Sequence, residues 1–315
     1  MAVKGKVGTC TTITRKSETF CYATLEFLAW ILEKNMVLKG FQITSEWLTE
    51  AKRLLDESPS SENAYVKPSV GSASALIFFR NLEKYNRIPI LFVSVCAFAD
   101  NAAHVAKSIQ GHLSDPAIPI KKNEDPFRVN PEATNLFGKE LRKVSAPLLE
   151  MVFSRLVDNL SSYLSSVTRE CLVSKHEILR SKETITFELA LNCDSMEELR
   201  ELIVDRKIDE LAYLGFGKLS DWISERLGID SPRRLPFYNH LVESVEIRNC
   251  IIHNGSRIGH KYLRTMPSAL QVQLNDHIDV DIDMIYCFSR AAAEYVCCLE
   301  AGLIEKFALP TSSTS

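Results

Sequence analysis

The 315-residue sequence lacks several features that would assign it to a common class of protein. None of its nine cysteines belongs to a CxxC pair, and no Cys/His cluster has the spacing of a zinc site, which indicates reduced thiols and no bound metal. GxSxG, HExxH and GxGxxG motifs are also missing, which excludes the common signatures of hydrolases, zinc proteases and dinucleotide-binding proteins. We therefore expect no cofactor.

Long hydrophobic runs and an excess of one charge are missing as well. The longest nearly unbroken apolar run, Ile88 to Ala99, is shorter than the roughly 20 residues of a bilayer-spanning helix, and the first residues contain no apolar signal-peptide core. We expect a cytoplasmic protein with no membrane partner. The formal net charge is -3, so binding to nucleic acid would require a local basic patch.

The composition, with 46% hydrophobic and 24% charged residues, is typical of a globular protein. The sequence also shows a succession of helical patterns. These patterns predict an all-α protein, with a four-to-five-helix bundle in the C-terminal half and a mainly helical N-terminal region of undetermined fold. Helices are expected at residues 19–34, 45–57, 136–168, 195–212, 217–227, 235–253 and 283–306. The apolar segment from Ile88 to Gln110 fits either one long helix or a strand followed by a helix.

Turn-forming residues divide the chain. Residues 58–74 have the composition of a loop, and four prolines occur between Ser114 and Thr134, which predicts a domain boundary near residue 135. The expected organisation is an N-terminal regulatory or sensor region at 1–135, a helical domain at 136–308 and a disordered tail at 309–315.

The most informative segment is LVESVEIRNCIIHNGSRIGH, from Leu241 to His260. It predicts a packed helix that ends at His253, where Gly255 supplies a left-handed cap. Asn249 and His253 share a helix face, whereas Arg248 lies about 140° around the helix from His253 and about 7.5 Å along its axis. One helix cannot direct all three side chains at one atom, but two helices related by a twofold axis can, so we expect a homodimer.

The residues from Arg248 to His253, RNCIIH, resemble the R-x4-6-H motif of the HEPN superfamily (higher eukaryotes and prokaryotes nucleotide-binding domains) and its RiboL-PSP-type ribonuclease domains. The family motif also carries a polar residue directly after the arginine. Residues 153–171 are similar to the first long helix of the family, and residues 195–211 precede the motif helix as expected. The resemblance covers residues 145–306 and does not extend to the N-terminal half.

Many members of this superfamily are metal-independent endoribonucleases, so the resemblance implies RNA cleavage through attack of the 2′-hydroxyl on the adjacent phosphate. Histidine suits the proton transfers of this reaction, and arginine suits the charge that builds on the phosphate. The candidate catalytic residues are Arg248, Asn249 and His253, with Asn249 holding the His253 ring or a substrate oxygen. DNA lacks the 2′-hydroxyl and should not be cleaved.

A basic segment follows the motif, and it either binds RNA or is a solvated loop. Its candidate RNA-binding residues are Arg257, His260, Lys261 and Arg264. The resemblance further implies that the protein is an effector, either in antiviral defence of the abortive-infection type or in a toxin-type stress response. Its activity would be controlled by a trigger or by a regulatory protein partner. In members paired with nucleotidyltransferases a tyrosine follows the histidine by two residues. Gly255 occupies that position here, which disfavours control by adenylylation.

Two other interpretations stay open. The chain could be a non-catalytic HEPN module that binds RNA or a protein partner, in which Arg248 and His253 are dimer contacts. Alternatively, it could be a purely structural interaction protein, in which these two residues only end a core helix.

Overall fold

The computed structural model describes residues 65, 67–120, 127, 130, 132–133, 135–179, 184–230, 232–234, 237–266 and 272–313. All of them belong to one compact unit, Glu62–Ser315. The helices expected at 19–34 and 45–57 lie outside the described residues.

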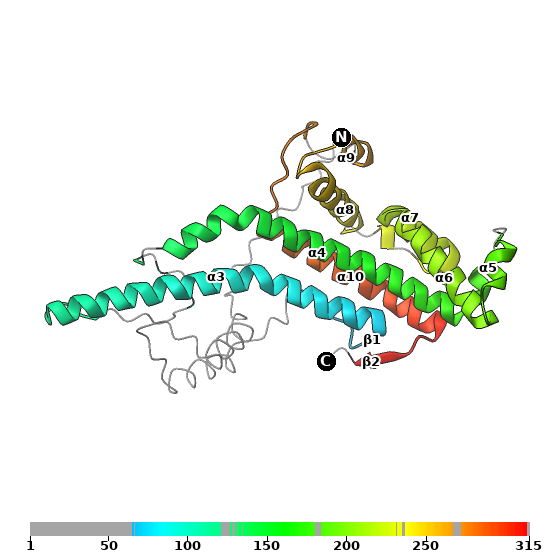
Figure 1. Cartoon of the computed structure of the whole chain (residues 1–315), viewed down its shortest axis with the longest axis horizontal. Helices are drawn as coiled ribbons and strands as arrows, with labels where there is room; N and C mark the ends of the chain where they lie inside the picture. The colour runs from blue at the N-terminus through cyan, green and yellow to red at the C-terminus, as the bar shows by residue number, and fades with distance from the viewer. Residues whose placement is uncertain are drawn as a thin grey trace, which may run out of the picture. The chain divides into compact units, whose positions relative to one another are not determined.

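The described unit is almost entirely helical, which confirms the predicted all-α class. Two long helices, α3 (Ala73–Ser114) and α4 (Leu136–Ser174), run side by side, and α10 (Ile282–Phe307) packs against both (Figure 1). The chain between α4 and α10 forms η1 (His176–Leu179), α5 (Phe187–Leu191), α6 (Met196–Ala212), α7 (Phe216–Trp222), η2 (Ile223–Leu227), η3 (Pro232–Arg234), α8 (Phe237–Asn254) and α9 (His260–Thr265). Each helix expected between residues 136 and 306 therefore has a helical counterpart.

Helix α3 decides between the two interpretations of the apolar segment, because residues 88–110 form a continuous part of one helix. The helix begins after Ser72, whose side chain accepts a hydrogen bond from the Ala75 amide at 3.2 Å. By length and composition α3 could cross a membrane, and 28% of its most apolar window is buried within the unit. A single such helix is only a weak indication of a membrane protein, because core helices of soluble proteins have the same character.

Helix α4 supplies one face of the hydrophobic core. Its residues Phe153, Leu156, Leu160 and Leu164 recur every three or four positions, and each is fully buried. Phe153 packs edge-on against Phe288 of α10, with the ring centroids 5.7 Å apart. Burial of each such leucine or phenylalanine stabilises the fold by about 2 kcal/mol, so the three long helices are held together mainly by these contacts.

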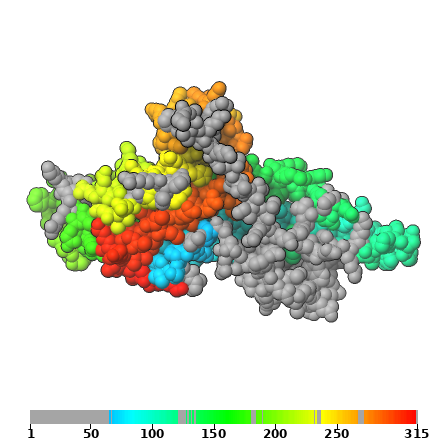
Figure 2. Space-filling view, turned by 180° about the vertical axis from the view of Figure 1, so that it is seen from behind, coloured from blue at the N-terminus to red at the C-terminus, as the bar shows by residue number. Residues whose placement is uncertain are grey.

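Two short strands, β1 (Val70–Ser72) and β2 (Thr311–Ser313), pair in an antiparallel sheet, with Gly71 opposite Ser312. Neither strand was expected, since residues 58–74 were predicted to form a loop and 309–315 a disordered tail. The tail prediction is wrong for 311–313, because their backbone groups pair with β1 and the adjacent Leu309 is buried. Figure 2 shows the start of the described unit (blue) lying against its C-terminal end (red).

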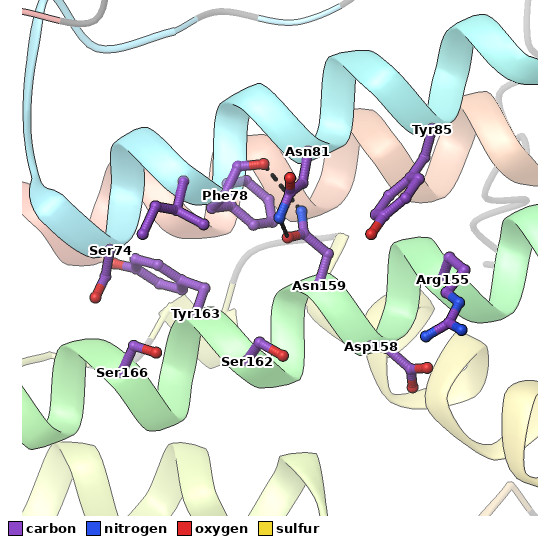
Figure 3. A pocket seen from close by; sticks show the side chains of 11 residues that line it. Ser74, Phe78, Asn81, Tyr85, Arg155, Asp158, Asn159, Ser162, Tyr163 and Ser166 are labelled. Atoms are coloured by element: carbon purple, nitrogen blue, oxygen red, sulfur yellow. Dashed lines mark hydrogen bonds between the residues drawn. The ribbon is translucent and has the colours of Figure 1, made fainter.

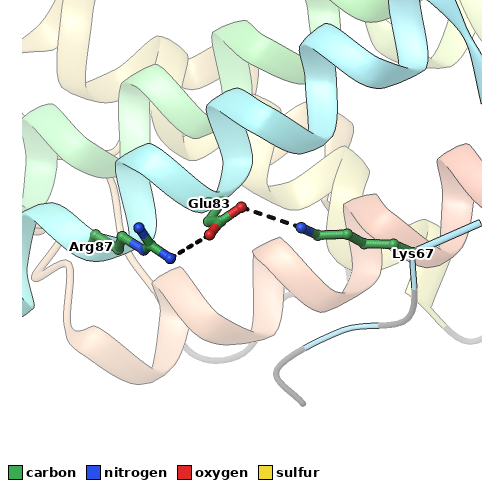
Figure 4. Close-up of polar contacts among 3 residues, drawn as sticks. All are labelled: Lys67, Glu83 and Arg87. Carbon is green, nitrogen blue, oxygen red and sulfur yellow. Dashed lines mark hydrogen bonds and ion pairs between the residues drawn. The ribbon is translucent and has the colours of Figure 1, made fainter. Parts of the chain in front are cut away.

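The chain entering β1 is also held to α3 by charge. Glu83 of α3 forms an ion pair with Lys67 at 3.2 Å and a second one with Arg87, one turn further along the helix (Figure 4). The three side chains are between 33% and 42% exposed, so solvent screens these pairs and each stabilises the fold by about 1 kcal/mol at most.

The domain boundary expected near residue 135 falls inside this unit. Helix α3 precedes that position and α4 follows it, yet Phe78 and Leu82 of α3 belong to the same buried cluster as the core residues of α4. Asp100 of α3 also accepts hydrogen bonds from the amides of Phe137 and Gly138, at 3.0 and 2.9 Å, and so caps the first turn of α4. The proline-containing segment therefore joins two helices that share one core.

Glu300 of α10 is a carboxylate with only 2% of its surface exposed, and it joins three elements. It accepts hydrogen bonds from the amide and hydroxyl of Ser72, at 2.8 and 3.0 Å, and from the hydroxyl of Tyr163 at 2.7 Å. Burial and the neighbouring Glu300 raise the pKa of Tyr163 well above its usual value, so this hydroxyl stays protonated and donates. Glu300 thus fixes β1 and α4 to α10.

Replacing Glu300 with alanine should lower the free energy of unfolding by about 3 kcal/mol, because buried donors would lose their acceptor. Chemical denaturation followed by circular dichroism measures this loss. The matched control is Glu305→Ala, an exposed position on the same helix, which should change stability by less than about 0.5 kcal/mol. Similar effects of the two variants would contradict the role given to Glu300.

Candidate functional site

Helix α8 carries the motif residues, and it ends as the sequence predicts. Its buried residues Leu241, Ser244 and Cys250 face the core, and its last residue is Asn254. Gly255 follows with a φ of 58°, in the left-handed region that glycine adopts without strain. Arg248, Asn249 and His253 consequently occupy the last turns of a helix whose opposite side is anchored in the core.

Arg248 is held by a residue of α4. Its Nη2 atom lies 2.7 Å from Oδ1 of Asp158, and the two side chains are only 26% and 36% exposed. Its Nη1 atom donates to Oδ1 of Asn249 at 3.4 Å. The buried Nε atom has no hydrogen-bond partner. The guanidinium is therefore fixed in position while some of its five N–H groups stay unused.

The contacts continue from Arg248 toward α9. The amide of Asn249 donates to Glu246 at 3.5 Å, and the other oxygen of Glu246 lies 3.2 Å from Nζ of Lys261. These five residues form a polar chain (Asp158, Arg248, Asn249, Glu246 and Lys261) that crosses α8 and connects α4 to α9. With two carboxylates and two cations the polar chain is electrically neutral, so its charges are mutually compensated.

His253 lies outside the polar chain. Its side chain is exposed, and it forms no hydrogen bond or ion pair with any residue that the structure describes. The Asn249 amide is engaged by Arg248 and Glu246, so the expected contact between Asn249 and the His253 ring is not formed within the chain. The imidazole is accordingly accessible to a ligand or to a second protein chain.

The four basic residues of this segment differ in whether they have a hydrogen-bond or ion-pair partner. Arg257 donates to the backbone oxygen of Asn275 at 2.9 Å, and Lys261 is paired with Glu246. His260 and Arg264 are exposed on α9 and have no partner within the described ranges.

The buried Tyr262 anchors helix α9 to α8, in addition to the ion pair between Lys261 and Glu246. The Tyr262 hydroxyl donates to Glu243 of α8 at 2.9 Å. Burial and this hydrogen bond raise the pKa of Tyr262, so the contact persists at neutral pH. The cations of α9 are thereby kept near the end of α8.

Sequence reasoning missed one contributor to this region, Asp158. Asp158 is 90 positions before Arg248, and the only sequence signal for it is an acidic residue within the apolar pattern of α4. It also lines a pocket of about 140 Å³ between α3 and α4 (Figure 3). The residues that line the pocket are Ser74, Ile77, Phe78, Asn81, Tyr85, Arg155, Asp158, Asn159, Ser162, Tyr163 and Ser166.

Among the residues that the structure describes, no group of three or more His, Cys, Asp or Glu side chains is arranged to hold a metal ion. Comparisons of the chain with protein-family models, with curated proteins and with solved structures give no match. The HEPN assignment therefore rests on the sequence resemblance alone.

The contact between Asp158 and Arg248 can be measured by a double-mutant cycle. The variants Asp158→Ala and Arg248→Ala should couple by about 1 kcal/mol in the free energy of unfolding, because the ion pair is half-buried. Arg142 is an exposed arginine near the N-terminal end of α4 and serves as the control. The effects of Arg142→Ala and Asp158→Ala on the free energy of unfolding should be additive. Additivity of both pairs would mean that Arg248 is not held by Asp158 in solution.

Proposed function

We propose that the chain is a metal-independent endoribonuclease that works as a homodimer. The observation that carries this proposal is that the end of α8 holds both an accessible histidine, His253, which has no partner among the described residues, and an arginine that Asp158 fixes one to two turns away. The sequence resemblance to the HEPN superfamily supplies the reaction class. A dimer is favoured because α8 alone cannot bring both side chains to one phosphate. Ile252, beside His253, is 52% exposed and would be covered in a dimer contact.

The proposed reaction is a transesterification within RNA. One His253 accepts the proton of the ribose 2′-hydroxyl as the 2′-oxygen forms a bond to the phosphorus atom. The bond between phosphorus and the 5′-oxygen breaks, and the His253 of a second copy protonates that leaving oxygen. The products are a 2′,3′-cyclic phosphate and a 5′-hydroxyl, with no metal or redox partner consumed.

Arg248 serves as the phosphate-binding group in this proposal. A guanidinium binds two phosphate oxygens at once, and its charge opposes the charge that accumulates on them in the transition state. Asp158 and Asn249 each engage one terminal nitrogen, which orients the group before substrate arrives. In the alternative function, a non-catalytic module that binds RNA or a protein, the same exposed His253 and Ile252 would be contact residues only.

The biological role follows the resemblance. An enzyme of this kind would act as a defence or toxin-type effector, with RNA as substrate, and residues 1–135 would respond to a trigger or a regulatory partner. Such a region would have to end before residue 73, since residues of α3 (73–114) share a core with the motif-bearing unit.

The variants His253→Ala and Arg248→Ala should each lower RNA cleavage at least 100-fold, the order expected for losing a proton-transfer or charge-stabilising group. Cleavage of a fluorescently labelled RNA in the presence of EDTA measures this, with DNA of the same sequence left intact. His277→Ala is the matched control, because His277 is an exposed histidine near the site and pairs with Asp279. Equal cleavage by wild type and His253→Ala would favour the non-catalytic alternative.

The basic segment should contribute to RNA affinity in proportion to its uncompensated charge. Arg264→Ala should flatten the slope of log affinity against log salt concentration by about one, whereas Lys261→Ala should change it less, because Lys261 is already paired with Glu246. Fluorescence anisotropy at several salt concentrations gives both slopes. If neither slope changes, the segment is a solvated surface and RNA binds elsewhere.

A further inference from the structure

The pocket between α3 and α4 has an apolar floor and polar walls. The rings of Phe78 and Tyr163 lie beneath it, with their centroids 5.5 Å apart, and both side chains are buried. Asn81 and Asn159 face each other across the two helices, and serines of α3 and α4 complete the walls (Figure 3). A ligand that fits this surface is flat and apolar on its faces and polar at its edges.

The volume of the pocket matches one ring. A cavity of about 150 Å³ accommodates a benzene molecule, and this pocket measures about 140 Å³. A pyrimidine base matches this volume, whereas a purine, with its second fused ring, exceeds it. A six-membered ring with polar edges also matches the combination of an aromatic floor with amide and hydroxyl walls.

The amides can pair with the edge of such a base. Asn159 is fixed, because its Nδ2 donates to the Phe78 carbonyl at 2.9 Å and its Oδ1 accepts from Asn81 at 3.2 Å. Asn81 uses only one N–H in this contact, and within the described part of the chain its Oδ1 atom has no partner. An adjacent donor and acceptor are thus available, as pairing with a base edge requires.

The end of the pocket carries a cation, Arg155, for which the described residues provide no ion-pair partner. Arg155 is exposed and pairs with no residue that the structure describes, because the nearby Asp158 is already engaged by Arg248. Tyr85 lies at the same end, across the pocket from Arg155 (Figure 3). Asp158 is the one carboxylate that lines the pocket, and its charge is compensated by Arg248, so the Arg155 guanidinium is suited to a phosphate attached to the base-bearing sugar.

We propose that the pocket between α3 and α4 is a binding site for a pyrimidine nucleotide, with the base inserted between the two helices, its edge on Asn81 and its phosphate on Arg155. The nucleotide is either free or part of an RNA strand. The RNA source rests on the proposed function, and there the pocket would hold a pyrimidine of the substrate strand away from the cleaved bond, with Asp158 lining the pocket and also holding Arg248.

Isothermal titration calorimetry of the full chain with single nucleotides tests the site without any cleavage assay. Uridine and cytidine 5′-monophosphate should bind at least tenfold more tightly than the adenosine and guanosine nucleotides. Ser162→Trp, which fills the pocket from its exposed rim, should weaken binding at least tenfold. Ser161→Trp is the matched control, because Ser161 is exposed on the same helix and does not line the pocket.

A second pair of variants tests the phosphate contact. Arg155→Gln should weaken uridine monophosphate about tenfold and leave uridine itself unchanged, as expected for the loss of one charge-assisted contact. Arg142→Gln, an exposed arginine of α4 outside the pocket, should leave both unchanged. Effects of Arg155→Gln that are equal for uridine and its phosphate would overturn the assignment of Arg155.

The RNA arm compares binding of oligouridylate and oligoadenylate to the His253→Ala chain. A tenfold loss for oligouridylate with Ser162→Trp supports RNA as the source, whereas a loss confined to the single nucleotides supports a free nucleotide. No pyrimidine binding in either arm up to about 1 mM, equal binding of purines, or binding that Ser162→Trp leaves intact would overturn the proposal. Nucleotide binding without RNA cleavage would leave the site standing and overturn the ribonuclease.

Discussion

The buried carboxylate of Glu300 is the constraint on which the arrangement of the long helices depends. A carboxylate removed from water needs several donors, and Glu300 finds them in Ser72 and Tyr163. Ser72 also caps α3, since its hydroxyl accepts from the Ala75 amide. The position where α3 begins is therefore set by α10, and the register of α3 along α4 follows from it. That register brings Asn81 opposite Asn159 and creates the pocket between them.

Polar residues of helix α4 contact three neighbouring helices. These hydrogen bonds and this ion pair fix the positions of the neighbours in addition to the burial of apolar side chains. Tyr163 reaches Glu300 of α10, Asn159 reaches α3, and Asp158, next to it in sequence, points around the helix to Arg248 of α8. Adjacent positions on a helix diverge by about 100°, so two consecutive residues can serve different partners. The pocket and the motif are linked through this pair of residues, although they lie on different sides of α4.

The sequence was sufficient for features that are local or periodic. Apolar spacing located the helices between residues 136 and 306, and Gly255 marked the end of α8. Contacts between distant residues could not be predicted from the sequence, because a polar residue in a helix gives the same sequence pattern whether it is solvated or paired. Examples are the contacts of Asp158 with Arg248 and of Glu300 with Ser72. Three-residue strands carry no periodic signal, and prolines indicate a turn without distinguishing a helical hairpin from a linker between domains.

The contacts of Arg248 are compatible with the proposed homodimer. Asp158 draws the guanidinium toward α4, and Asn249 supports it there, while His253 extends from the final turn into solvent. Moving Arg248 toward its own His253 would break the ion pair and leave Asp158 half-buried without a partner, which is unfavourable. Bringing the His253 of a second chain to the fixed arginine requires no such loss. In the proposed homodimer the ion pair between Asp158 and Arg248 would therefore stay intact, and a ligand in the proposed pocket site would act on Arg248 through Asp158, which lines the pocket.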